Sequence, residues 1–190
     1  MRNKSVANRN IFPNVRAKDP YSDEWYTPQT LVRSLGKFDL DPCAGPCNHA
    51  VENIRRPDCG LSIKWKGRVW LNPPYLEISP WLERMIDHNN GILIVNARPE
   101  TNWFQNTARY ATSLFFPKGR IKFERPGGGS KNPPVGSCLM SFGTRNATAL
   151  IRSELPGLFV WQNISAALQP PPDAMTPAIL ACSSLLSSVS

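Results

Sequence analysis

The apolar and polar residues of this chain follow patterns that alternate between short strands and short helices. The clearest strand is GILIVNA at 91–97, because an uninterrupted apolar run is typical of a strand buried on both faces of a parallel sheet. Shorter apolar runs predict further strands at 38–42, 68–72, 112–117 and 157–162. We expect helices at 28–35, 79–89, 100–110 and 146–154.

Two of the expected helices have recognisable ends. Thr27 is a candidate N-cap with Pro28 in the first helical position, and Gly36 stands where a C-terminal cap belongs. Ser79 and the proline after it begin the next helix, which Gly91 is expected to end.

The segment 43–66 and a predicted hairpin complete the pattern of elements from which we infer the fold class. Segment 43–66 contains Cys, Asn, Pro and Gly with little apolar rhythm, so we expect mostly loop with at most one weak strand or helical turn. GRIKFE and VGSCLMSFG predict a hairpin around the Gly-rich loop 126–136. Strands that alternate with helices and finish in a hairpin indicate an α/β fold, with a mostly parallel sheet and an antiparallel edge hairpin.

Length and composition indicate one globular domain, because the chain has 190 residues and 41% of them are apolar. We expect this domain at 23–163. A polar and basic arm without periodicity precedes it at 1–22 and is expected to be flexible. The tail at 164–190 is rich in Ser, Ala and Pro and is expected to be disordered.

The charge balance favours a polyanionic partner. Lys and Arg number 22 against 14 Asp and Glu, which gives a net charge of +8, and nucleic acid is the first candidate. No apolar run reaches the roughly 18 residues of a membrane span, and the first residues lack the apolar core of a signal peptide. The five cysteines form no paired framework, which suits a reducing compartment, so a cytoplasmic protein is expected.

The sequence LNPPY at 71–75 carries the most specific chemical signal. The ends of parallel strands are where α/β folds hold ligands, and Asn72 follows the strand expected at 68–72. An exocyclic amino group on a nucleobase is a poor nucleophile, because its lone pair is delocalised into the ring. The amide oxygen of Asn72 and the carbonyl of Pro73 can accept both amino hydrogens and localise that lone pair. Proline fixes φ near −65°, so Pro73 and Pro74 hold these carbonyls, and Tyr75 offers a face on which the base can stack.

A second strand end provides a candidate cofactor site. DLDPCAG at 39–45 combines a strand, the acid Asp41 and a turn of small residues, in which Gly45 would let backbone approach a ligand. S-adenosylmethionine (SAM) would be the electrophile that an activated amino group attacks. The alternative is an Asp-Pro turn that merely closes a strand. A second Asn-Pro-Pro sequence, at 132–134, follows glycines and precedes Val135, so we interpret it as loop.

Five segments together resemble a known family. They are DEWYTP (23–28), DLDPCAG (39–45), GRVWLNPPY (67–75), NARPETNWF (96–104) and FPKGRIKF (116–123). With these segments in this order, the chain resembles the phage-encoded Dam-type DNA N6-adenine methyltransferases from about Asp23 to about Phe159. The resemblance implies a shortened Rossmann-like fold that binds SAM and methylates adenine N6 in double-stranded DNA by base flipping and direct in-line transfer. It also implies a phage or prophage protein that acts in a bacterial cell, where methylation can serve restriction-modification.

The resemblance assigns roles to particular residues. The catalytic loop is Asn72, Pro73, Pro74 and Tyr75. The cofactor residues are Tyr26, Thr27, Asp41, Pro42, Cys43, Ala44 and Gly45, of which Tyr26 and Thr27 would close over the methionine end of SAM. Lys118 and Arg120 match the family's basic hairpin, and Arg98 matches its segment after the buried strand. With Lys122 and Lys131, which belong to the same cluster of positive charge, they are the expected nucleic-acid contacts.

The acid that would hold the cofactor's ribose stays open. Thirty residues, 42–71, separate Asp41 from Asn72, and one βαβ unit alone needs about that many. The strands and full helices that larger methyltransferases place here do not fit. Glu52 and Asp58 are both candidates for the ribose contact, and Asp58 is included with the cofactor residues.

Three alternatives remain at this point. Cys43, Cys47, His49 and Cys59 have the chemistry of zinc ligands, but their spacing is unusual and no metal is expected. A catalytically inactive, basic DNA-binding module would bind phosphates with the same lysines and arginines, together with Arg125. RNA or protein glutamine could replace DNA as the acceptor, because an amide nitrogen poses the same electronic problem. Neither the oligomeric state nor the DNA recognition sequence follows from the residues.

Overall fold

The computed structural model describes residues 25–124, 130–131 and 134–162. The arm expected at 1–22 and the tail expected at 164–190 lie outside these residues, as do Asn132 and Pro133 of the second Asn-Pro-Pro sequence. Within the described part, seven strands form one sheet in the order β2-β1-β3-β4-β8-β5-β9. Their bounds are Leu40–Asp41 (β1), Glu52–Asn53 (β2), Val69–Leu71 (β3), Gly91–Asn96 (β4), Ser113–Pro117 (β5), Ser137–Phe142 (β8) and Gly157–Trp161 (β9).

The strand directions confirm the expected fold class. β2, β1, β3 and β4 are parallel to one another, whereas β8 is antiparallel to both β4 and β5, and β9 is antiparallel to β5. The chain is thus a mixed α/β fold with a mostly parallel sheet, consistent with a Rossmann-like methyltransferase fold. In the segment expected to be mostly loop, the short β2 is the one strand described.

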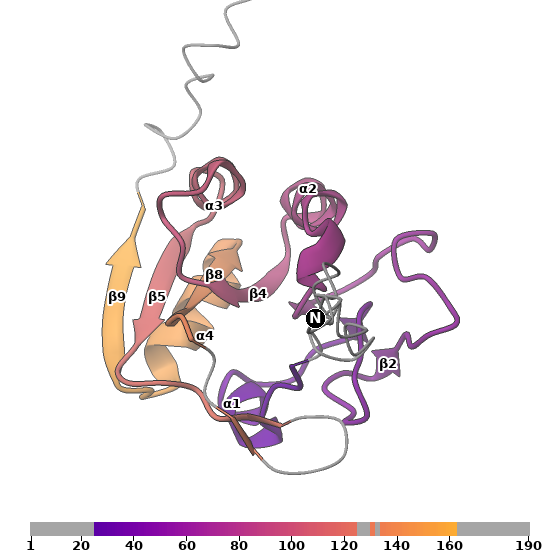
Figure 1. Ribbon diagram of the computed structural model, residues 1–190, viewed down its shortest axis with the longest axis horizontal. Coiled ribbons are helices and arrows are strands. Elements are labelled where there is room, and N and C mark those ends of the chain that lie inside the picture. The colour runs from indigo at the N-terminus through magenta and orange to yellow at the C-terminus, as the bar shows by residue number, and fades with distance from the viewer. Residues whose placement is uncertain (1–24, 125–129, 132–133, 163–190) are drawn as a thin grey trace, which may run out of the picture.

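Helices cover both faces of the sheet (Figure 1). Helices α2 (Ser79–His88) and α3 (Asn102–Ala108) lie on one face, and α1 (Gln29–Ser34) and α4 (Thr144–Arg152) lie on the other. Alternate residues of each central strand therefore enter different cores. Leu71 and Leu93 pack with residues of α2 and α3. Trp70 and Ile92 pack with residues of α1 and α4.

The expected hairpin is wrong in its pairing. β6 (Phe123–Glu124) pairs with β7 (Ser130–Lys131) in a separate two-stranded sheet, while VGSCLMSFG contributes β8 to the interior of the main sheet. All six residues of β8 are buried. A strand with two apolar faces buries most surface between two helical layers, which explains its place between β4 and β5.

Two helix ends also differ from expectation. Pro28, rather than Thr27, is the N-cap residue of α1, and no side chain caps this helix. Gly36 does follow the helix end, with φ +90°. Helix α2 ends at Asn89, which adopts the left-handed conformation with φ 48°, and Gly91 begins β4 instead. Asn tolerates this conformation better than most residues, so it replaces the expected glycine.

Arg68 fixes the beginning of β3 against the α1 side of the sheet. Its guanidinium donates hydrogen bonds to the carbonyls of Leu35 and Lys37, each at 2.9 Å, and to Oδ1 of Asn146 at 2.6 Å. The same group lies 4.1 Å from the ring centroid of Phe38. Burial lowers the pKa of Arg68 to about 10, so the side chain stays charged at neutral pH. These contacts hold the strand that leads into LNPPY.

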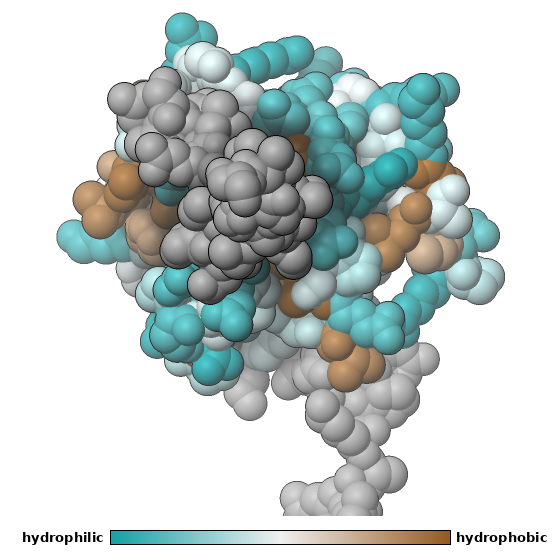
Figure 2. Space-filling model, turned by 90° about the horizontal axis from the view of Figure 1, so that it is seen from above, coloured by the Kyte–Doolittle hydropathy of each residue, from teal (hydrophilic) through white to brown (hydrophobic). Residues whose placement is uncertain are grey.

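Seen from the side of α2 and α3, the surface is largely hydrophilic, with separate apolar patches near its edges (Figure 2). Among the residues that the structure describes, the exposed large apolar side chains are Val51, Leu76, Tyr110, Ile151, Leu158, Val160 and Trp161. Of the helices in the described residues, none combines the length and the hydropathy that crossing a membrane requires.

Candidate active site

One cavity of about 1000 Å³ collects most of the residues that the sequence singles out. It opens where β1 and β3 end, because parallel strands bring their carboxyl ends to the same edge of the sheet. Its wall includes three segments that are far apart along the chain, namely Trp25–Thr27, Asp41–Cys47 and Asn72–Glu77. The expected catalytic loop and the expected cofactor turn therefore face one space.

The amide of Asn72 has a defined orientation. Its Nδ2 donates hydrogen bonds to the carbonyl of Trp25 at 2.6 Å and to Oγ1 of Thr27 at 3.3 Å. A carbonyl oxygen can only accept, so the Trp25 contact distinguishes the nitrogen of the amide from its oxygen. Among the described residues, none donates a hydrogen bond to Oδ1 of Asn72. The side chain thus keeps its acceptor for a ligand.

The double proline leads directly into a short 3₁₀ helix, Tyr75–Glu77. Pro74 precedes this helix in an extended conformation, with ψ 136° and a φ of −66° that its ring enforces. The backbone is therefore stiff between the end of β3 and the aromatic ring of Tyr75. Preorganised carbonyls in such a segment need no reorganisation when a ligand arrives.

Tyr75 is anchored to the neighbouring strand. Its hydroxyl accepts a hydrogen bond from the backbone N–H of Asn96, the last residue of β4, at 2.5 Å. The ring packs edge-on against Trp103, with 6.5 Å between centroids. Burial raises the pKa of Tyr75 well above its ordinary value, so the hydroxyl remains neutral. The ring position is fixed by these two contacts, and the ring still lines the cavity.

Asp41 is a buried carboxyl in the cavity wall. Only 2% of the residue is exposed, and Oδ1 accepts a hydrogen bond from the backbone N–H of Cys43 at 3.1 Å. Burial raises the pKa of Asp41 to about 7, although the Cys43 hydrogen bond and the positive charge of Arg55 each lower it. A cationic ligand group would favour the ionised form.

Arg55, which the sequence interpretation did not single out, holds the loop that follows the cofactor turn. Its Nε donates to the carbonyl of Gly45 at 2.8 Å, and its Nη2 donates to the carbonyl of Cys47 at 3.3 Å and to Oδ1 of Asn48. The parallel strands β1 and β2 are joined by the segment 42–51, where a helix usually connects two parallel strands. Here the side chain of Arg55, just after β2, holds this segment by hydrogen bonds instead. A hydrogen bond between one side chain and a distant backbone carbonyl leaves no periodic pattern in the sequence, so this role of Arg55 could not be predicted.

The packing of Tyr26 gives one structural reason for a glycine at position 45, while its expected approach to a ligand stays a prediction. A Cβ atom built at Gly45 would lie 2.4 Å from Cδ1 of Tyr26, so it is the Tyr26 ring that approaches this turn. The backbone of Tyr26 also exchanges two hydrogen bonds with Glu124 of β6, at 2.9 and 3.0 Å. Tyr26 therefore connects the cavity wall to the two-stranded sheet β6-β7.

The structure separates the two candidates for the ribose contact. Asp58 lines the cavity, whereas Glu52 is exposed and does not belong to its wall. His49 also lines the cavity, and its Nδ1 is buried without a hydrogen-bond partner. Burial lowers the pKa of His49, so its ring is neutral at neutral pH.

The cysteines are brought together without forming a metal centre in the described residues. Cys43, Cys47, His49 and Cys59 all line the cavity. In this part of the chain, however, no group of three or more His, Cys, Asp or Glu side chains is arranged to hold a metal ion.

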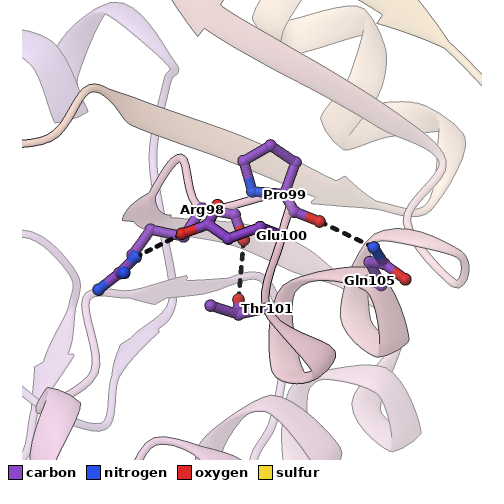
Figure 3. Close-up of polar contacts among 5 residues, drawn as sticks. All are labelled: Arg98, Pro99, Glu100, Thr101 and Gln105. Carbon is purple, nitrogen blue, oxygen red and sulfur yellow. Dashed lines mark hydrogen bonds and ion pairs between the residues drawn. The ribbon is translucent and has the colours of Figure 1, made fainter.

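The expected nucleic-acid contacts lie outside the cavity wall. Arg98 forms an ion pair with Glu100 at 2.9 Å, on a loop that Thr101 and Gln105 brace by donating to the carbonyls of Arg98 and Pro99 (Figure 3). Both charged side chains are more than half exposed. Three other expected nucleic-acid contacts have described side chains, and all three are exposed, namely Lys118, Arg120 and Lys122. The backbone of Lys131 pairs with Phe123, while its side chain lies outside the description.

Comparison with known proteins identifies the family. Searches of curated proteins and of solved structures found no match. A family model described as DNA N-6-adenine-methyltransferase (Dam) matches residues 14–150, which is well over half of the 190 residues and includes both the catalytic-loop and the cofactor-turn sequences. The chain belongs to the DNA N-6-adenine-methyltransferase (Dam) family.

Proposed function

We propose that the protein transfers a methyl group from SAM to the N6 amino group of adenine in double-stranded DNA. The observation that carries this proposal is the amide of Asn72 in the cavity wall, whose nitrogen is held by Trp25 and Thr27 while none of the described residues donates to its oxygen. Family membership supports adenine in DNA as the acceptor.

The residues of the cavity fit the cofactor. A space of about 1000 Å³ accommodates a molecule of this size, and SAM supplies an electrophilic methyl group on a sulfonium. Asp41 offers a buried carboxyl that suits a cationic ligand, and Asp58 offers an acceptor for the ribose hydroxyls. Tyr26, whose ring lies against Gly45, and Thr27 would close over the methionine end.

The catalytic loop would prepare the amino group for attack. Oδ1 of Asn72 and the carbonyl of Pro73 accept the two N6 hydrogens, which draws the lone pair out of conjugation and directs it along the line of transfer. The new N–C bond forms as the S–C bond breaks, and its electron pair stays on the sulfur of S-adenosylhomocysteine. One N6 proton then passes to solvent, so the product amine is neutral. An Asn suits this role better than an Asp, because it accepts without adding a buried charge that would need a partner.

The target base must leave the duplex to reach this cavity. Flipping costs a few kcal/mol, and stacking on the ring of Tyr75 would return about 1–3 kcal/mol. Contacts between phosphates and basic residues around Lys118 and Arg120 would supply the remainder. The reaction proceeds by direct in-line transfer, without a covalent enzyme intermediate.

The decisive experiment incubates the protein with labelled SAM and separate pools of DNA, RNA and protein. We expect label in DNA, recovered as N6-methyladenine, and sequencing of the product then maps the methylated site. The Asn72→Ala variant is the matched control and should label the DNA about 10²–10³ times more slowly. Label in RNA or in glutamine side chains would replace the substrate, and no label in any pool would support the inactive DNA-binding module.

A further inference from the structure

Leu76 is an exposed leucine at the edge of the candidate active site. Its relative exposure is 82%, and it lines the cavity next to Tyr75 in the 3₁₀ helix Tyr75–Glu77. Single exposed apolar residues are common on protein surfaces and need no explanation by themselves. The position of this one, beside the residue expected to receive a base, makes it distinctive.

The backbone holds Leu76 outward with little freedom. On one side the extended Pro74 precedes the 3₁₀ helix, and on the other Ser79 begins α2 only two residues after it. Within the helix, the hydroxyl of Tyr75 is bonded to Asn96 and its ring packs on Trp103. An apolar side chain on such a rigid support keeps its place when it meets a partner, so little ordering entropy is lost.

Base flipping creates a partner of matching chemistry. When a base leaves the duplex, its neighbours lose a stacking contact and an apolar gap remains in the stack. Proteins that unstack DNA insert apolar side chains, leucine among them, between base steps. A residue that fills the gap must lie beside the cavity that receives the base, must be apolar, and must project outward. Leu76 meets these three conditions.

We propose that Leu76 enters the DNA stack at the position vacated by the target adenine and holds the flipped state open. This role rests on the proposed function, because it requires a flipped base. It extends that function by assigning a duplex contact to an exposed residue of the cavity wall. Leu76 would thus contribute only when the target base has to be separated from a paired, stacked duplex.

The test compares Leu76→Ala with Val51→Ala on two substrates. Val51 is as exposed, at 85%, but does not line the cavity, so its substitution controls for the loss of an exposed apolar side chain. One substrate is a duplex that carries the mapped site, and the other has an abasic position opposite the target adenine, which makes flipping easier. Replacing adenine with 2-aminopurine reports flipping directly, because its fluorescence rises when it leaves the stack.

On the intact duplex, Leu76→Ala should reduce kcat/KM roughly tenfold and diminish the fluorescence rise, as expected for loss of most of a buried leucine contact. The abasic partner should restore most of that activity, and Leu76→Met should retain it on both substrates. Val51→Ala should behave as wild type. Since Leu76 is exposed, the thermal unfolding midpoint should not move.

Equal losses on both substrates, or no loss on either, would overturn the role of Leu76. Equal losses would mean that Leu76 acts on the folded site or on another partner rather than on the stack. The proposed function fails separately, if the wild-type protein neither methylates DNA nor raises the 2-aminopurine fluorescence.

Discussion

Asn72 and Thr27 are joined by a hydrogen bond from Nδ2 to Oγ1 at 3.3 Å, across 45 residues of sequence. Nδ2 of Asn72 also donates a shorter hydrogen bond to the Trp25 carbonyl. Both contacts use the nitrogen of the amide, so Oδ1 is the atom left to accept a hydrogen bond from a ligand.

Asn72→Ala should therefore lower kcat by about 10²–10³, the usual effect of removing one preorganised group that stabilises a transition state. Binding of S-adenosylhomocysteine, measured by calorimetry, should be nearly intact. Thr27→Val, which keeps the shape but removes the hydroxyl, should cost only a few-fold in kcat. Retained activity in Asn72→Ala would exclude the acceptor role.

Tyr75 provides two separable contacts, a hydroxyl that accepts from the Asn96 backbone and a ring that lines the cavity. Tyr75→Phe should lower the free energy of unfolding by about 1 kcal/mol, because one hydrogen bond is lost, and should change DNA affinity little. Tyr75→Ala should weaken binding of the target site by about 1–3 kcal/mol. Fluorescence anisotropy with labelled duplex and urea unfolding measure the two effects. If both variants lose DNA affinity equally, stacking is not the role of the ring.

The raised pKa of Asp41 should make the free energy of unfolding depend on pH. Its folded pKa of about 7 lies above the ordinary value of 3.8, so the folded state keeps the proton that the unfolded state releases. The resulting stabilisation is fully present below about pH 4 and is lost as pH rises to about 7, by an amount on the order of 4 kcal/mol. Urea unfolding from pH 4 to pH 8 measures this slope against Asp41→Asn, in which it should be flatter. A slope identical in both proteins would mean that Asp41 is ionised throughout.

Arg55 holds the loop behind the cofactor turn and places a positive charge near Asp41. Arg55→Gln should raise the KM for SAM about tenfold with a smaller change in kcat, because several hydrogen bonds worth about 1 kcal/mol each are lost. It should also move the Asp41 titration to higher pH, since a charge that lowers this pKa is removed. Arg152→Gln, at an exposed position on α4, controls for the loss of one positive charge. A purely structural arginine would change stability without shifting the pH profile.

Lys118 and Arg120 lie on the exposed segment between β5 and β6. Their joint replacement by Gln should weaken DNA binding for all sequences and reduce the slope of log K against log salt by about 2, near 0.9 for each phosphate contact. Binding isotherms between 50 and 200 mM salt measure this slope. A parallel shift without a change of slope would place these side chains outside the interface.

How far the sequence could predict this protein depended on the range of the interactions involved. Uninterrupted apolar runs and capping residues are local signals, and they located the main strands and helices to within a few residues. The LNPPY and DLDPCAG sequences carried their own backbone restrictions, so their place at strand ends was also predictable. Neighbouring parallel strands then brought both to one edge of the sheet.

Other features depended on contacts between distant segments. VGSCLMSFG was expected to form a strand, but its place between β4 and β5 was not predicted, because an apolar run does not specify which strands flank it. Arg55 and Tyr26 act on the 45–48 loop through single side-chain contacts that leave no period in the sequence.

The sequence by itself thus determined the order of the elements and the chemical groups available at the strand ends, since local backbone preference and hydrophobic spacing act over a few residues. Only the tertiary structure decided which atom of Asn72 is held by hydrogen bonds, that Asp41 is buried enough to hold a proton near neutral pH, and that Leu76 is an exposed residue of the cavity wall. Hydrogen bonding, desolvation and exposure depend on groups that are far apart in the chain and meet only when it folds.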